Sequence, residues 1–293
     1  MNRDYWTIFF AAQLCALLCS VLGVYLNMRR QSMLVDVLSH SALPGVVLAY
    51  VIFAGYSAIG VSLGAALCAF VSVLAIEKLG SSRGRIKPDA SMAVIFTSMF
   101  ALGMLLIAYF AERTHIDVQC ALFGELLFSP FWGDLSFGGL LIPTVLARLL
   151  VAGVVVFGVL RLVHGRLLAA SFWGEGAALM GISPRGMTHV LAFLASLTVM
   201  VSFELVGVVL VIALFSIPPA FGRLWASSWR GMMIGAAVFA FVSTALGLAA
   251  GWWSGLNLGG TIASSQLLLF LASFVVHKLR YRLRRPVEAL HGG

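Results

Sequence analysis

An aspartate and a histidine lie four residues apart inside a strongly apolar stretch of the chain. Asp36 and His40 belong to the run 36–45, which reads Asp-Val-Leu-Ser-His-Ser-Ala-Leu-Pro-Gly. On an α-helix this spacing puts the carboxylate and the imidazole on one face, one turn apart. Such a ligand pair suits divalent zinc, manganese or iron, and ionisable residues inside a membrane segment normally face a cavity, a partner or a substrate path. The pair therefore predicts a transient metal site in a membrane pathway.

The same two residues also allow a purely structural interpretation. Asp36 would lie at the cytoplasmic end of a helix and pair with Arg29 or Arg30, while His40 would be a packing residue whose polar atoms are satisfied. Aspartate and histidine at this spacing are common in helices. The residue types by themselves leave both interpretations open.

A proline four residues after the histidine bears on this choice. Pro44 has no N–H, so the carbonyl of His40 cannot receive its usual helical hydrogen bond. Irregular backbone at membrane depth is tolerated where it lines a cavity or is buried in protein. We therefore expect Pro44 and the adjacent Gly45 to shape the pathway beside the candidate ligands; the alternative is that Pro44 only shapes the start of a helix.

A second proline site lies nearer the end of the chain. Pro218 and Pro219 deprive the carbonyls of Leu214 and Phe215 of their donors, which favours a break in the helix at a depth where backbone can line a pathway. The alternative is a helix that simply ends before the turn at Arg223. On the first interpretation, Pro218 is a further residue that shapes the pathway.

The composition indicates that the chain lies mainly in a membrane. Of its 293 residues 61% are hydrophobic and 10% are charged, and the mean hydropathy is +1.03, so most of the chain must lie in lipid or inside a membrane bundle. We predict an all-α, polytopic helical bundle with eight or nine membrane spans. The apolar stretches of sufficient length run over 6–27, 33–53, 58–76, 90–110, 138–160, 187–203, 205–222, 231–251 and 262–279. The two short stretches beside Phe203-Glu204 are either two spans or one broken span.

The net charge of +8 follows membrane topology and does not indicate a nucleic-acid surface. Basic residues gather in 77–89, in 161–186, around 223–230 and in the tail at 278–285. By the positive-inside rule these segments and the C-terminus are cytoplasmic, and with nine spans the N-terminus is outside. Arg148 lies instead within the fifth apolar stretch, where it would pair with Glu204 or Asp36 or lie at the membrane interface.

One segment on the basic side has the character of a docking element. Residues 171–184 read Ser-Phe-Trp-Gly-Glu-Gly-Ala-Ala-Leu-Met-Gly-Ile-Ser-Pro, which predicts a short helix of small residues that ends at a glycine and a proline. The segment either binds a cytoplasmic subunit or is an ordinary surface connector. The chain has no Walker A, His-Glu-x-x-His or Gly-x-Ser-x-Gly pattern. Any energy for transport must therefore come from a partner or a gradient.

Together these segments resemble the membrane subunit of the ATP-binding cassette importers for manganese, zinc and iron. The family pattern of the second segment is matched here by Arg29, Arg30, Asp36, Leu38, Ser39, His40, Leu43, Pro44 and Gly45. Weaker matches are 122–125 in the outer loop, Phe172, Ala177 and Gly181-Ile182 in the coupling segment, and 206–220. The chain departs from the pattern at Trp173, where the family usually has an acidic residue, and at Val37 and Ser41, where it has alanines.

The resemblance implies a single transmembrane permease domain, residues 1–293, in the bacterial cytoplasmic (inner) membrane. It implies that Asp36 and His40 coordinate a divalent metal cation in transit and that no cofactor is permanently bound. The segment 171–184 would couple to a separate cytoplasmic ATPase through Phe172, Glu175, Ala177 and Gly181. The permease itself would not be an enzyme. Its other partners would be a second permease copy, identical or paralogous, an extracytoplasmic metal-binding protein and membrane lipid, but no nucleic acid.

Two other classes of protein are compatible with the pair. A gradient-driven secondary transporter or channel would use Asp36 as a proton or cation site and need no ATPase. A membrane-embedded metalloenzyme would hold a hydrolytic metal on Asp36 and His40, but the sequence offers no convincing third ligand or general base. Because the same ligand types serve manganese, zinc and iron, the pair predicts the class of cargo and not the metal.

Overall fold

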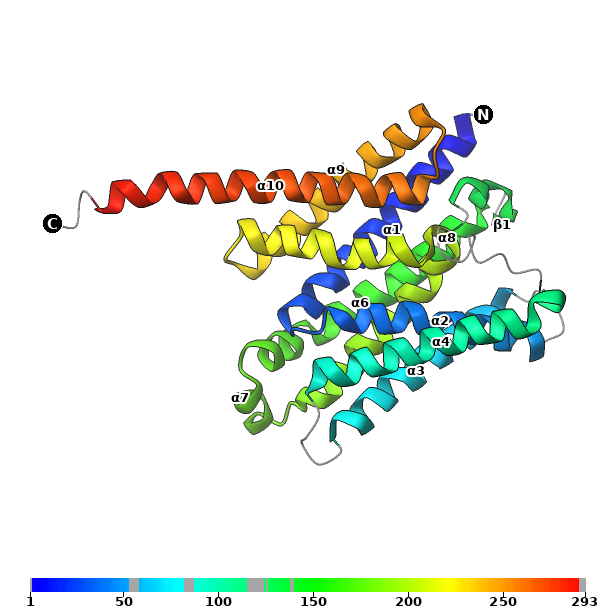
Figure 1. The fold of residues 1–293 in the computed structure, drawn as a ribbon, viewed down its shortest axis with the longest axis horizontal. Helices are drawn as coiled ribbons and strands as arrows, with labels where there is room; N and C mark the ends of the chain where they lie inside the picture. Colours follow the sequence, from blue (N-terminus) through cyan, green and yellow to red (C-terminus); the bar gives the residue numbers. More distant parts are fainter. Residues whose placement is uncertain are drawn as a thin grey trace.

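The computed structural model describes residues 2–52, 58–81, 87–114, 124, 126–137 and 140–289, and these form a helical bundle (Figure 1). The elements in chain order are α1 (Asn2–Met28), α2 (Met33–Ile52), α3 (Ala58–Ser81), α4 (Pro88–Thr114), the 3₁₀ helix η1 (Leu126–Trp132), β1 (Asp134–Phe137), β2 (Leu140–Pro143), α6 (Thr144–Phe172), α7 (Gly174–Leu179), α8 (Pro184–Trp225), α9 (Trp229–Ser254) and α10 (Leu258–Ala289). The strands form one small antiparallel ribbon. The prediction of an all-α bundle is confirmed.

Eight of these helices, all except α7, are long and apolar enough to cross a membrane. This agrees with the predicted count. The fifth span was expected over 138–160, but α6 begins only at Thr144 and continues to Phe172, because the preceding residues form the β1–β2 ribbon. The Thr144 hydroxyl donates to the Gly133 carbonyl at 2.9 Å and fixes the start of α6 against the ribbon.

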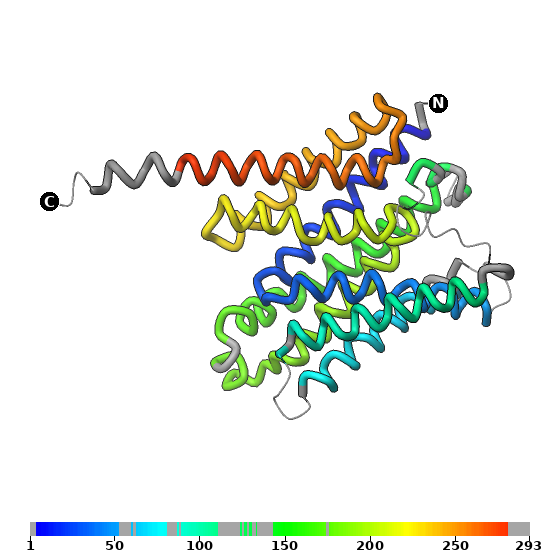
Figure 2. The backbone as a smooth tube through the Cα atoms, viewed as in Figure 1, coloured from blue at the N-terminus to red at the C-terminus, as the bar shows by residue number. Residues whose placement is uncertain are grey.

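Helix α8 is 42 residues long, and its regular geometry is interrupted at Gly207. The φ of 73° and ψ of 169° at Gly207 lie in a region that only glycine adopts readily. In Figure 2 the first half of α8, in yellow-green, crosses the bundle from the side of α7, and the second half, in yellow, runs back. The two halves, 184–206 and 208–225, are therefore separate helices that meet at this residue.

Two hydrogen bonds establish that α8 folds back on itself. Arg29 Nη2 donates to Thr188 Oγ1 at 2.8 Å, and Arg223 Nη1 donates to Asn27 Oδ1 at 3.3 Å, so both ends of α8 reach the same end of α1. A straight helix would separate residues 188 and 223 by about 50 Å. The two halves are antiparallel, so the eight candidate spans among the described residues give nine passes through the bundle. The turn lies at Gly207, three residues after the position expected from the apolar pattern.

The break expected at Pro218 and Pro219 is wrong, because the second half of α8 runs through both prolines to Trp225. The carbonyl of Phe215, which Pro219 deprives of its donor, lies against Gly23 of α1, where there is no room for a Cβ. The backbone of α1 at Gly23 thus packs closely against α8 where the hydrogen bond is missing. Pro218 is buried in the bundle, and its role in a pathway stays a prediction.

The bundle has two ends, which we name by the elements found there. The α7 end holds the α1–α2 turn at 29–32, α7 and both ends of α8. The ribbon end holds β1 and β2 (Figure 1). Gly207 lies against Gly124, which precedes η1 and β1 in the chain, so the turn of α8 belongs to the ribbon end. Helix α1 is the most buried of the candidate spans, whereas α4 and α10 expose most of their length. The core consequently lies around α1 and α8, and α4 and α10 face outward.

We predict that Gly207→Ala destabilises the protein by on the order of 1–3 kcal/mol, because a Cβ is strained at this φ and ψ. Gly158→Ala is the matched control: Gly158 lies within α6 with open space where a Cβ would be added, so alanine should not destabilise that helix. Thermal unfolding of both variants in detergent tests this. Equal melting temperatures for the two variants would contradict the assigned turn.

Candidate functional site

Asp36 and His40 lie in the first two turns of α2, and both side chains are half-buried. The predicted helical spacing is confirmed. Asp36 is the fourth residue of α2 and thus lies close to a helix end, as the structural interpretation expected. Within the described part of the chain, Asp36 forms no ion pair with Arg29, which donates to the Pro184 carbonyl and to Thr188 instead.

The imidazole of His40 is held between two aromatic rings of α4. The ring centroids of Phe96 and Phe100 lie 4.7 and 4.9 Å from that of His40, and both rings are nearly perpendicular to it. The Nδ1 atom of His40 is buried without a hydrogen-bond partner. An unpartnered buried nitrogen is costly and calls for an explanation such as an absent ion. The packing-residue interpretation, which required satisfied polar atoms, does not account for it.

Two neighbouring hydroxyls share this condition. The Oγ atoms of Ser39 and Ser41 are buried and have no hydrogen-bond partner, so three successive residues of α2 carry an unpartnered polar atom. Among the described residues, no group of three or more His, Cys, Asp and Glu side chains gathers in one place. One chain therefore offers Asp36 and His40 as a pair, and a bound cation would need further ligands from water or another chain.

Helix α2 is held closely by its neighbours beyond the pair. Pro44 is the twelfth residue of the helix, so the alternative that it shapes a helix start is wrong. It packs against Gly103 of α4, where an added Cβ would lie 3.0 Å from the proline Cδ. Gly45 packs against Gly64 of α3 so closely that a Cβ on either would meet the carbonyl of the other. These contacts fix α2 between α3 and α4.

Arg148 pairs with Glu204 and not with Asp36. The Arg148 Nη1 to Glu204 Oε2 distance is 3.0 Å, and the side chains are 38% and 15% exposed. This decides among the three expectations for Arg148. The contact ties the start of α6 to the first half of α8 near the turn at Gly207.

The predicted short helix is present as α7, Gly174–Leu179, and it ends as expected at a glycine. Gly181 has φ of 75°. The Ile182 N–H donates to the Ala177 carbonyl at 2.9 Å and the Gly181 N–H to that of Ala178 at 3.1 Å. This pair of bonds is the Schellman motif, which closes a helix at a left-handed residue. The segment thus has a fixed geometry between α6 and α8.

Large apolar side chains surround α7 at the surface. Phe172, Trp173, Leu179 and Met180 are 70%, 63%, 90% and 67% exposed. Exposed apolar side chains on either side of a short helix are compatible with an interaction site. Ala177 is buried on the inward side of α7, beneath these exposed side chains. The side chain of Glu175 lies outside the described residues. The indole of Trp173, at the position where the sequence departs from the family, lies over Gly176.

The described residues form a helical bundle with eight candidate membrane spans, in which a half-buried carboxylate and imidazole lie one helical turn apart on α2. Residues 5–277 match the ABC 3 transport family, and the chain belongs to that family. It is 29% identical over 279 residues to the manganese transport system membrane protein MntD of Bacillus subtilis, covering 94% of this chain and 92% of the relative. A probable iron transport system membrane protein of Haemophilus influenzae is 29% identical over 275 residues, covering 92% and 90%.

A solved structure has the same fold. PsaBC from Streptococcus pneumoniae, in complex with Fab, superposes with a TM-score of 0.75 at 23% sequence identity, covering 92% of this chain and 90% of that chain. The chain is accordingly a membrane permease of the ATP-binding cassette class, and it hydrolyses no ATP itself, since this is done by a separate subunit.

We predict that Pro44→Ala restores the missing hydrogen bond to the His40 carbonyl and leaves the protein no less stable, yet slows transport. The gain in helix hydrogen bonding offsets the lost contact with Gly103. Thermal stability in detergent and ATP-driven uptake into proteoliposomes should be measured on one preparation. A parallel loss of stability and transport, or full transport, would argue against a role for that carbonyl.

Proposed function

We propose that this chain is the permease subunit of an ATP-driven importer of a divalent transition-metal cation, manganese, zinc or iron, and that Asp36 and His40 coordinate the cation in transit. The observation that carries the proposal is the buried, unpartnered Nδ1 of His40 one helical turn from the Asp36 carboxylate. Relatives named for manganese and iron transport support the class of cargo.

A second copy of the chain would complete the coordination. Two ligands from each protomer become four if the α2 helices meet across a two-fold axis. Four oxygen and nitrogen ligands suit tetrahedral zinc, or manganese with added waters. A permeation site must also release its ion, so few protein ligands from each chain favour turnover.

Charge supports the orientation of the subunit in the membrane. The basic side chains at the α7 end are Arg29, Arg30, Lys78, Lys87, Arg166, Arg185, Arg223, Arg230, Lys278 and Arg280. The positive-inside rule places this end, with α7 and the end of α10, in the cytoplasm. The ATPase would therefore bind at α7, and the extracytoplasmic metal-binding protein would deliver the cation at the ribbon end.

A gradient-driven transporter is the main competing function. It would work without an ATPase, and uptake would collapse with the ion gradient. The exposed apolar side chains around α7 favour the importer, because a transporter of that kind has no use for a docking surface at this position.

We predict that Asp36→Ala and His40→Ala each reduce metal uptake to background, because each removes half of the ligands that a chain supplies. Asp89→Ala, at the exposed start of α4, and His277→Ala, on α10, are matched controls far along the chain from the pair. Radioactive manganese uptake and co-purification with the ATPase should be measured for all four variants. Near-normal uptake in either ligand variant would refute the assignment.

We predict that single cysteines at Leu179 and Met180 form cross-links to the ATPase, since these side chains are 90% and 67% exposed beside α7. Ala177→Cys, which points inward, and Lys87→Cys, exposed before α4, are the controls. Cross-linked products are identified by mass spectrometry. Capture of the ATPase from Lys87→Cys alone would rule out the segment 171–184 as its docking site.

A further inference from the structure

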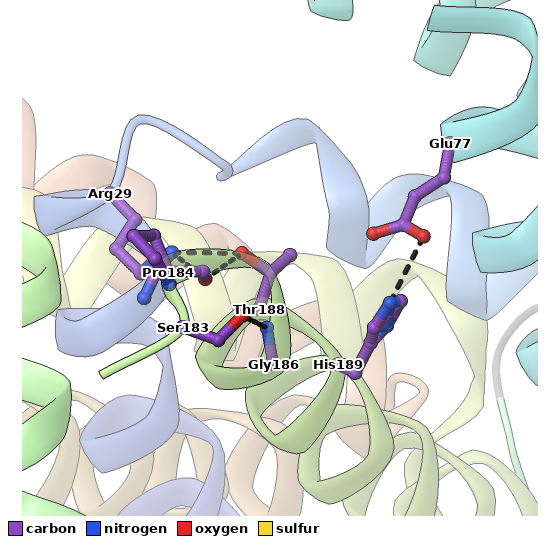
Figure 3. A network of polar contacts seen from close by, with 7 residues as sticks. All are labelled: Arg29, Glu77, Ser183, Pro184, Gly186, Thr188 and His189. Atoms are coloured by element: carbon purple, nitrogen blue, oxygen red, sulfur yellow. Dashed lines mark hydrogen bonds and ion pairs between the residues drawn. The ribbon is translucent and has the colours of Figure 1, made fainter. Parts of the chain in front are cut away.

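A network of polar contacts joins the coupling segment to the turn before the metal pair (Figure 3). Arg29 Nη2 donates to the Pro184 carbonyl at 3.0 Å and to Thr188 Oγ1 at 2.8 Å. The Thr188 hydroxyl in turn donates to the Pro184 carbonyl at 3.1 Å, so the three groups form a closed set. The Ser183 hydroxyl caps the same helix by accepting from the Gly186 N–H at 3.1 Å.

The network joins Pro184, at the end of the coupling segment, to Arg29, in the turn before α2. Pro184 is the last residue of the segment 171–184 and the first residue of α8, so the chain passes from α7 into α8 within a few residues. Arg29 lies in the short turn between α1 and α2, seven residues before Asp36. The neighbouring Arg30 has φ of 56°, an uncommon value for a residue other than glycine, and the turn is tight.

Arg29 is suited to hold two elements in a fixed orientation. A guanidinium presents several donors in a planar fork, so two bonds from one side chain set direction as well as distance. The side chain is half-buried, and burial lowers the pKa of Arg29 from its ordinary value, although an arginine stays charged at neutral pH. Its Nη1 atom is buried and has no partner, which leaves it able to bond in a second arrangement.

A second contact ties the next turn of α8 to α3. His189 Nε2 lies 3.0 Å from Glu77 Oε2, and the side chains are 34% and 37% exposed. The two residues come from helices on different sides of the α2 start (Figure 3). The first two turns of α8 are therefore bound both to the α1–α2 turn and to α3.

These contacts border a cleft of about 630 Å³ at the α7 end. Its lining includes Leu34, two residues before Asp36, and Met92, one helical turn before the Phe96 that packs on His40. Glu77 and Thr188 line it as well. The cleft thus borders the start of α2, although Asp36 and His40 are not among its lining residues, and it lies at the end of the bundle where the proposed function requires the cation to leave.

We infer that the first two turns of α8 relay the movement of the coupling segment to the metal pair. Arg29 is the positioning residue of this relay, because it joins α8 to the turn that carries α2. The His189–Glu77 contact holds the cleft in its present shape until α8 moves. The inference rests on the proposed function for its cargo, but the mechanical link between α7 and α2 can be tested without it.

The first test measures how many cations cross for each ATP hydrolysed. The permease is assembled with its ATPase and metal-binding protein in proteoliposomes, and radioactive manganese uptake and phosphate release are followed together. Arg29→Gln should keep ATPase binding and hydrolysis but lower the manganese-to-ATP ratio about tenfold, within the usual range of coupling between two sites. Arg29→Lys, which keeps the charge and loses the fork, should recover only part of the ratio.

Two further variants control for charge and for folding. Arg230→Gln removes an exposed positive charge from the start of α9, outside the cleft and the relay, and should leave the ratio unchanged. Thr188→Val removes one acceptor of Arg29 at nearly constant side-chain volume. It should lower the manganese-to-ATP ratio, but by less than Arg29→Gln does. An unchanged ratio in both Arg29→Gln and Thr188→Val would overturn the relay, and so would loss of ATPase binding in step with thermal stability.

The second test does not depend on the cargo. A cysteine in place of the exposed Ser32, between Arg29 and α2, reports on the turn in a background whose native cysteines are replaced by alanine. Its labelling rate should change when ATP and vanadate trap the complex, and Arg29→Gln should abolish that change. A change that persists in Arg29→Gln would overturn the relay. Absence of manganese, zinc and iron uptake by the unsubstituted complex, with the labelling change intact, would instead refute the proposed cargo.

Discussion

A chain in lipid must satisfy its backbone hydrogen bonds within the protein, and the rest of this structure depends on that requirement. Pro44 in α2 and Pro218 and Pro219 in α8 remove donors, and Gly207 interrupts α8 at a further position. At Pro219 the freed carbonyl lies against Gly23, and Pro44 lies against Gly103. Glycine recurs opposite these places because only a residue without a Cβ lets one backbone cover another. Irregular geometry and small residues are thus paired across neighbouring helices.

The same close contacts give the metal pair a defined position. Helix α2 is fixed between α3 and α4 through Gly45 and Pro44, so Asp36 and His40 cannot shift independently of the bundle. The aromatic rings around His40 restrict its imidazole further. What remains adjustable is the end of α2 nearest the α7 end, where a tight turn and a few side-chain bonds join it to α8. The metal pair is thus held rigidly by α3 and α4 and joined to α8 by a few polar bonds. This combination suits a site that must bind a cation and then release it.

Much of the fold and the helical position of the pair could be predicted from the sequence, because apolar length and four-residue spacing are local properties. The turn at Gly207 was misplaced by three residues, since hydropathy reports lipid exposure and carries no information on φ. The start of α6 was missed because the short strand before it is as apolar as the helix. The choice of Glu204 as the partner of Arg148, and of Phe96 and Phe100 as neighbours of His40, depends on helix packing between distant segments. The sequence named Glu204 as one of two candidate partners for Arg148, but nothing in the local pattern of Phe96 and Phe100 distinguishes them from lipid-facing residues.

The fold-back of α8 also has a consequence for the biogenesis of the protein. Its two halves emerge from the ribosome in succession, and with a turn at the ribbon end they enter the membrane as one helical hairpin. With the α7 end in the cytoplasm, as proposed above, Glu204, close to that turn, crosses the hydrocarbon during this step, which is expensive for an isolated carboxylate. Arg148 belongs to a helix that is synthesised earlier and is already in place. Because α6 precedes α8 in the chain, Arg148 is available to pair with Glu204 when α8 inserts. The order of the helices therefore lowers the cost of inserting the glutamate.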